Sequence, residues 1–129
     1  MSHLYAIDAQ KSFSEFAETT SIPISSVDKK TDSTGFHSIS FGIPEGEWGD
    51  FKGQIRNTTE FLVRWERELA EFTAALAPEE FTLKFVVFSR LNEVVVQNDR
   101  LPKDLIAVAG RIGLSILFSS FSPDSVSDL

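Results

Sequence analysis

The chain of 129 residues contains no cysteine, only two histidines and no long apolar run. The absence of cysteine excludes a disulfide scaffold, a cysteine-ligated zinc site and a thiol nucleophile. No apolar run approaches the about 20 residues that a membrane-spanning helix needs. The first residues also lack a basic segment followed by an apolar one, so no secretory signal is predicted. We therefore expect a cytoplasmic protein.

Basic residues are few and scattered. The longest basic run is Lys29 and Lys30, and 12 basic residues stand against 19 acidic ones, which gives a net charge of −7. Nucleic acids and anionic membrane surfaces are bound by clusters of Lys and Arg, so neither is expected as a partner. The negative charge either attracts a basic protein over distance or serves only to keep the protein in solution.

The motifs of common catalytic and cofactor sites are also missing: the chain has no Gly-x-Ser-x-Gly, Gly-x-Gly-x-x-Gly or Walker sequence. His3 lies close to the start of the chain. His37 shares a predicted strand face with Ile39 and Phe41, which favours a partly buried histidine whose hydrogen bonds go to the backbone. Neither histidine has a carboxylate at metal-ligand spacing on a recognisable helix. We predict no catalytic residue, no metal and no cofactor.

Against these absences, 42% of the residues are apolar and 24% are charged, as in a folded globular domain. The clearest pattern lies at 58–76, where apolar residues recur at intervals of 4, 4, 3 and 4 and predict one helical stripe. Asn57 is the predicted cap of this helix, and Pro78 prevents its continuation. The stripe residues are Phe61, Trp65, Leu69, Phe72 and Leu76.

The remaining segments alternate between strand and helix patterns. Alternation and β-branched residues predict strands, whereas helical spacing and a proline at the helix start predict helices. Strands are predicted at 4–7, 36–43, 81–89, 93–97 and 114–121, helices at 12–19 and 101–112, and an extended segment around Pro23. The closeness of 81–89 and 93–97 predicts an antiparallel hairpin.

This element order, β-α-β-α-β-β-α-β, predicts an α+β two-layer sandwich. We expect a mostly antiparallel sheet of about five strands, with helices packed mainly on one face. The chain contains no linker long enough to divide it, so residues 1–121 are predicted to form a single domain. The tail at 122–129 is rich in Ser, Asp and Pro, and it is predicted to be flexible.

Four segments of the C-terminal half carry a family pattern: 85–88 (FVVF), 94–96 (VVV), 101–109 (LPKDLIAVA) and 113–118 (GLSILF). Together with the long helix they resemble, over about residues 55–121, an uncharacterised bacterial α+β family. Some members of that family look like immunity proteins that accompany secreted toxins. The resemblance implies an α+β fold and an immunity-type function. No catalytic residue can be carried over, and the last strand lacks the acidic residue and tyrosine of the family pattern.

The loop at 44–53 combines carboxylates with large aromatic side chains, which suits the binding of a basic partner. Either Trp48 is exposed and anchors such a partner, or Trp48 and Phe51 fold back over the core while the acidic side chains stay solvated. The candidate partner-binding residues are Glu45, Glu47, Trp48, Asp50 and Phe51.

Three hypotheses of function follow. The first is a non-catalytic protein-binding module, of which an immunity-type protein that neutralises a basic toxin or effector is one form. The second is a small-molecule-binding domain or small enzyme with an apolar cleft between sheet and helices, which the 12 phenylalanines could line as readily as a core. The third is a subunit that forms a homodimer through a sheet edge or an uncovered sheet face, with Phe41, Val86 or Phe88 in the contact.

Overall fold

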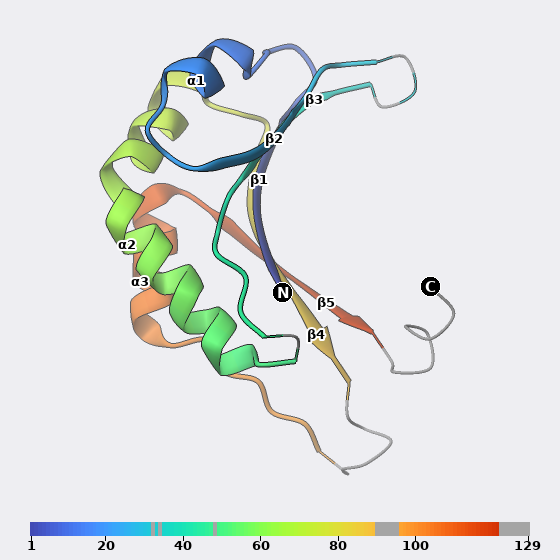
Figure 1. Ribbon diagram of the computed structural model, residues 1–129, viewed down its shortest axis with the longest axis vertical. Helices are drawn as coiled ribbons and strands as arrows, with labels where there is room; N and C mark the ends of the chain where they lie inside the picture. The colour runs from blue at the N-terminus through green and yellow to red at the C-terminus, as the bar shows by residue number, and fades with distance from the viewer. Residues whose placement is uncertain (32, 34, 48, 90–95, 122–129) are drawn as a thin grey trace.

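The fold is that of a computed structural model, which describes residues 1–31, 33, 35–47, 49–89 and 96–121. They form one sheet with helices along one of its faces (Figure 1). The α+β two-layer class predicted from the sequence is therefore confirmed. In chain order the elements are β1 (Ser2–Asp8), α1 (Ser14–Thr19), β2 (Ile24–Asp28), β3 (His37–Phe41), α2 (Phe51–Leu76), β4 (Glu80–Phe88), α3 (Lys103–Ile112) and β5 (Ser115–Phe121).

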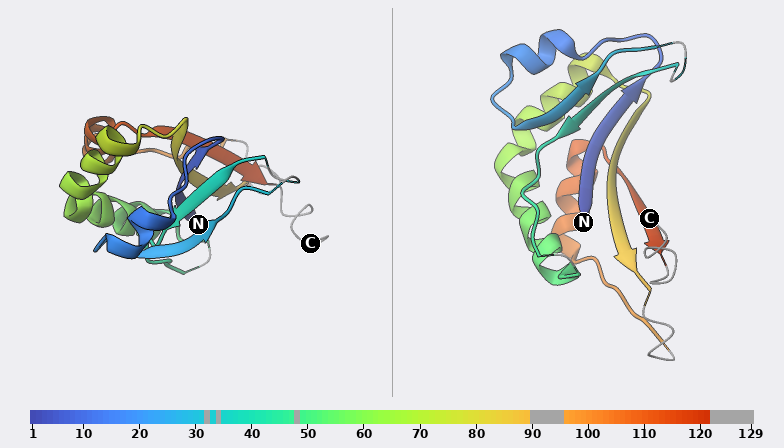
Figure 2. Two further views of the ribbon diagram at one scale, coloured as in Figure 1. Left: turned by 90° about the horizontal axis from the view of Figure 1, so that it is seen from above. Right: turned by 45° about the vertical axis from the view of Figure 1, so that its right-hand side comes forward.

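The sheet has the strand order β2-β3-β1-β4-β5. β1 lies in its centre, with Leu4 opposite Phe41 of β3 on one side and opposite Leu83 of β4 on the other. All neighbouring pairs are antiparallel except β4 and β5, which are parallel and joined through α3. Figure 2 shows α2 and α3 side by side against one face of the sheet. No helix within the described ranges is both long and apolar enough to cross a membrane.

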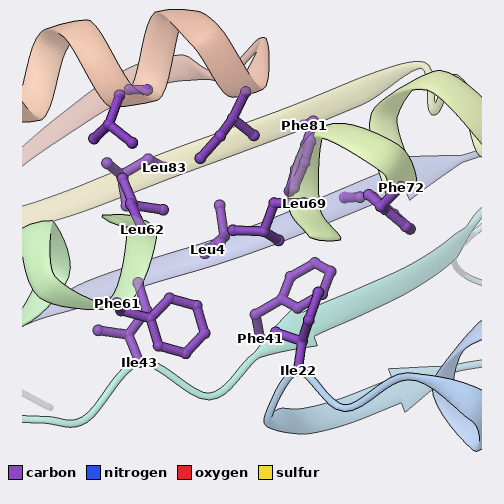
Figure 3. Close-up of a cluster of buried hydrophobic side chains, with 14 of the residues drawn as sticks. Leu4, Ile22, Phe41, Ile43, Phe61, Leu62, Leu69, Phe72, Phe81 and Leu83 are labelled. Atoms are coloured by element: carbon purple, nitrogen blue, oxygen red, sulfur yellow. The ribbon is translucent and has the colours of Figure 1, made fainter. Parts of the chain in front are cut away.

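The core lies between this helical layer and the sheet. Leu4 and Leu83 from the sheet and Leu69 from α2 are fully buried there (Figure 3). The ring of Phe72 lies 5.5 Å from that of Phe41 and 5.1 Å from that of Phe81, both in edge-to-face geometry. Such aromatic pairs add to the gain from burying apolar surface. The phenylalanines at this end of the sandwich therefore pack against one another.

The stripe predicted for 58–76 faces the core. Phe61, Leu69 and Phe72 are buried, and Trp65 and Leu76 are partly buried against the same cluster. The helix ends where it was predicted to end, at Leu76, with Ala77 in the left-handed conformation and Pro78 after it.

The start of α2 differs from the prediction by two turns. The helix begins at Phe51, so Asn57 lies inside it and is not the cap. The carboxylate of Asp50 is the cap, since its Oδ1 accepts a hydrogen bond from the Gly53 N–H at 3.0 Å. A Cβ atom on Gly53 would collide with this carboxylate. Glycine suits this position in the first turn of α2, because a larger residue would collide with the Asp50 carboxylate that caps the helix. In the sequence the same glycine is typical of a loop.

Two further elements differ from the predicted order. The serine-rich segment after Pro23 forms the edge strand β2, where only an extended segment was predicted. Residues 93–95 of the predicted strand 93–97 lie outside the described residues, and Val96 and Gln97 are not in a strand. The neighbours of β4 are β1 and β5, so its pairing partners come from the two ends of the chain and not from an adjacent hairpin strand.

Candidate functional site

The acidic loop before α2 divides into exposed and structural residues. Glu45 and Glu47 are exposed and make no ion pair with any residue that the structure describes. Asp50 is the helix cap. Phe51 is partly buried, and its ring lies 6.0 Å from that of Phe85 in edge-to-face geometry, so it packs against the core. Trp48 lies outside the described residues.

The two histidines have different surroundings. His37 is partly buried, and its Nδ1 accepts a hydrogen bond from the backbone N–H of Lys30 at 3.2 Å. This agrees with the predicted structural role. His3 lies on the sheet face opposite the helices, where desolvation and then the charge of Lys84 lower its pKa below the usual value. In the described part of the chain, no three His, Cys, Asp or Glu side chains are grouped so that they could hold a metal ion.

The sheet face opposite the helices carries part of the apolar patch suggested for self-association. Val86 and Phe88 are partly buried on this face, and Leu117 and Phe121 lie opposite Lys84 and Phe88 on β5. Phe41 does not belong to this face. It is only 4% exposed, because its side chain points between β3 and α2 into the aromatic cluster. The suggestion that Phe41 contributes to a surface contact was therefore wrong.

The two edges of the sheet are built differently. β2 follows Pro23, has a register shift between Ile24 and Ser26 and ends in the charged residue Asp28. Prolines, bulges and charges are the features by which natural proteins prevent other chains from pairing with an edge strand. β2 is thus a protected edge.

β5, at the opposite edge, has none of these features. It holds seven residues without a charge, a proline or a glycine, and its pairing with β4 is regular throughout. Leu117 and Phe118 are 45% and 44% exposed and point to opposite faces of the sheet, and Phe121 is 37% exposed. The outer backbone groups of β5 have no strand beside them in the described part of the chain. A strand of this kind is suited to pair with another chain.

A second feature is a cavity of about 780 Å³ at the end of the sandwich away from the aromatic cluster. It lies between the first turns of α2, the end of β4 and the segment 97–102. Phe51, Ile55, Phe88 and Pro102 give it apolar walls. The volume falls within the range of small-molecule sites in proteins.

Gln54 borders this cavity and is 5% exposed. Its Nε2 is buried and has no hydrogen-bond partner among the residues that the structure describes. Buried polar groups in folded proteins nearly always have a partner, so this amide is a polar group left unsatisfied. Sequence reasoning missed Gln54, because the residues around Gly53 read as a loop.

Comparison with known proteins adds no family to this description. The chain matches no protein-family model, no curated protein and no solved structure.

Proposed function

We propose that this chain is a non-catalytic protein-binding module that pairs the outer edge of β5 with an extended segment of a basic partner protein. The observation that carries the proposal is the contrast between the two sheet edges. β2 is protected by a bulge and by charge, whereas β5 is regular, uncharged and exposes Leu117 and Phe118. In such pairing, backbone hydrogen bonds hold the added strand, and alternate side chains give the specificity.

The charge of the chain supports a basic partner. The net charge is −7, and the exposed carboxylates of Glu45 and Glu47 form no ion pair with a described residue. Glu45 does lie near enough to the Met1 ammonium and to His3 to interact with both electrostatically. Opposite charge speeds encounter and guides orientation, while the uncharged edge makes the close contact. The resemblance of residues 55–121 to immunity-type domains supports a toxin or effector as this partner.

The test compares two serine-to-lysine variants on opposite edges of the sheet. Ser120 in β5 and Ser26 in β2 are both exposed, so neither change disturbs the core. Candidate partners are the products of adjacent genes, and affinity is measured by calorimetry at low and high salt. We expect Ser120→Lys to weaken binding about tenfold or more, equal to about 1.4 kcal/mol, and Ser26→Lys to leave it unchanged.

Two further measurements examine the same proposal. Amide hydrogen exchange of β5 should slow in the complex, and affinity should fall as salt rises. Equal binding by both variants, or unchanged exchange in β5, would overturn the proposal. A dimer in light scattering that Ser120→Lys dissociates would show that the edge binds a second copy of the chain in place of a different protein.

A further inference from the structure

The cavity between α2 and β4 combines apolar walls with a hydrogen-bond donor that the protein leaves unused. The Nε2 of Gln54 has no hydrogen-bond partner within the described ranges, and Gln54 borders the cavity. The last torsion of a glutamine side chain is soft, so the amide can turn toward an acceptor that enters the cavity. An acceptor supplied by a ligand would satisfy a group that the folded protein leaves unsatisfied.

Side chains of both charges line the cavity. Of its two acidic lining residues, Asp50 caps α2, and Asp99 Oδ2 accepts a hydrogen bond from Gln97 Nε2 at 2.9 Å. Lys52 and Arg100 also line the cavity, and neither makes an ion pair with a described residue. The two carboxylates keep their negative charge in these hydrogen bonds, so the lining holds two acidic and two basic side chains. Only the two basic ones have neither a hydrogen bond nor an ion pair with a described residue. The cavity also adjoins the positive end of the 26-residue helix α2.

We propose that this cavity binds a small molecule with an apolar body and a carboxylate group, which accepts a hydrogen bond from Gln54 and faces Lys52 and Arg100. The apolar body would lie against Phe51 and Phe88, two partly buried residues that line the cavity from α2 and from the end of β4. The inference does not rest on the proposed function, because no residue of β5 lines the cavity.

The charges and the donor make separate contributions, so they can be tested separately. A carboxylate must lose part of its hydration on entering an apolar cavity, and this loss is recovered only where donors and positive charge replace water. A neutral alcohol of the same chain length has the same apolar body without the charge. Decanoate and decanol are therefore matched probes.

The experiment measures the binding of both probes to the full chain by calorimetry at low salt. We expect decanoate to bind about tenfold or more tightly than decanol. Gln54→Leu should weaken decanoate binding about fivefold or more and decanol binding by less, because a carboxylate is a stronger acceptor than a hydroxyl. Lys52→Gln, an exposed change, should also weaken decanoate binding, whereas Arg56→Gln removes a cation from the same helix outside the cavity and should have no effect.

Each other result overturns the inference. Failure of decanoate to bind would show that the cavity does not accept such molecules. Equal affinity for decanoate and decanol would show that no carboxylate is recognised. Equal effects of Lys52→Gln and Arg56→Gln on decanoate affinity would show that the affinity depends on the overall surface charge and not on a cation at the cavity. Shifts of the Gln54 and 97–101 amide resonances on adding decanoate would place the probe in the cavity, and shifts confined elsewhere would exclude it.

Discussion

The side-chain hydroxyls of Ser2 in β1 and Thr58 in α2 lie 2.9 Å apart and form a hydrogen bond between the sheet and the helix layer. Both residues are buried, with Thr58 fully enclosed. Each hydroxyl is therefore satisfied by the other in a part of the molecule from which water is excluded. Such a pair is costly to break from one side, because the remaining group keeps its polarity and loses its partner.

We expect Thr58→Val to lower the free energy of unfolding by about 1–3 kcal/mol, because the Ser2 hydroxyl is left buried without a partner. The double variant with Ser2→Ala should lose less than the sum of the two single variants. Urea denaturation measures all three. Thr59→Val is the control, since that hydroxyl donates only to the Ile55 carbonyl of its own helix. A Thr58→Val loss no larger than that of Thr59→Val would contradict the prediction.

Gly53→Ala tests the cap of α2. Alanine in place of a helical glycine ordinarily gains about 1 kcal/mol. Here the new Cβ would displace the Asp50 carboxylate, and losing a cap costs about 1 kcal/mol. We expect these effects to cancel, so that Gly53→Ala leaves the thermal midpoint nearly unchanged.

In a protein that already carries Asp50→Ala, the cap is absent and only the gain from alanine remains. Gly53→Ala should then raise stability by about 1 kcal/mol. The same gain with and without Asp50 would show that the carboxylate does not constrain Gly53.

The unsatisfied amide of Gln54 predicts a stabilising substitution. Gln54→Leu keeps the approximate size of the side chain and removes a buried donor that has no partner in the described part of the chain. We expect the free energy of unfolding to rise by about 1–2 kcal/mol in the absence of any ligand, as measured by urea denaturation. Gln10→Leu, at an exposed position, is the matched control and should have no such effect. A loss of stability in Gln54→Leu would show that the amide is satisfied in solution.

Asp8 makes the free energy of unfolding depend on pH in the acidic range. Its Oδ1 accepts backbone hydrogen bonds from Lys11 and Gln10, and its Oδ2 accepts one from Glu79, which ties the end of β1 to the start of β4. These hydrogen bonds hold the pKa of Asp8 below its usual value of 3.8. Between the folded pKa and 3.8 the unfolded chain binds more protons, so the stability that Asp8 contributes is complete above 3.8 and is lost as pH falls through the folded pKa.

We therefore expect the urea midpoint to fall as pH is lowered below 3.8, and Asp8→Asn to show a lower midpoint at pH 7 with a weaker fall in acid. Asparagine offers an acceptor at only one atom, so at least one of the backbone donors loses its partner. Parallel pH profiles for the two proteins would exclude this role of Asp8.

The sequence predicted the parts of the fold that depend on local periodicity. The spacing of Phe61, Leu69 and Phe72 placed the long helix and its buried face. The start of that helix was missed because Gly53 is a poor helix former, and only its contact with Asp50 explains its place there. β2 was not predicted as a strand, since an edge strand rich in serine lacks an alternating apolar face.

Local sequence patterns could not predict which strands pair when they lie far apart in the chain. Hydropathy marked 81–89 and 114–121 as strands, but it carries no information that they pair in parallel. The candidate sites likewise divide into one that local sequence predicts and one that only the folded chain brings together. The acidic loop is visible in the sequence, whereas the cavity joins Gln54 to Arg100 only through the fold. The lack of a partner for Gln54 depends on every neighbouring side chain, so no pattern in the sequence could reveal it.

The central position of β1 bears on how the chain folds as it leaves the ribosome. β1 is synthesised before both of its neighbours in the sheet, and β3 becomes available to it before β4, whose Phe85 lies opposite Ser2. During that interval the nascent chain has one side of its middle strand open, and a tethered chaperone or a neighbouring polypeptide could pair there first. Slow translation of residues 41–80 would lengthen this interval. We expect co-translational aggregation to increase as the interval becomes longer.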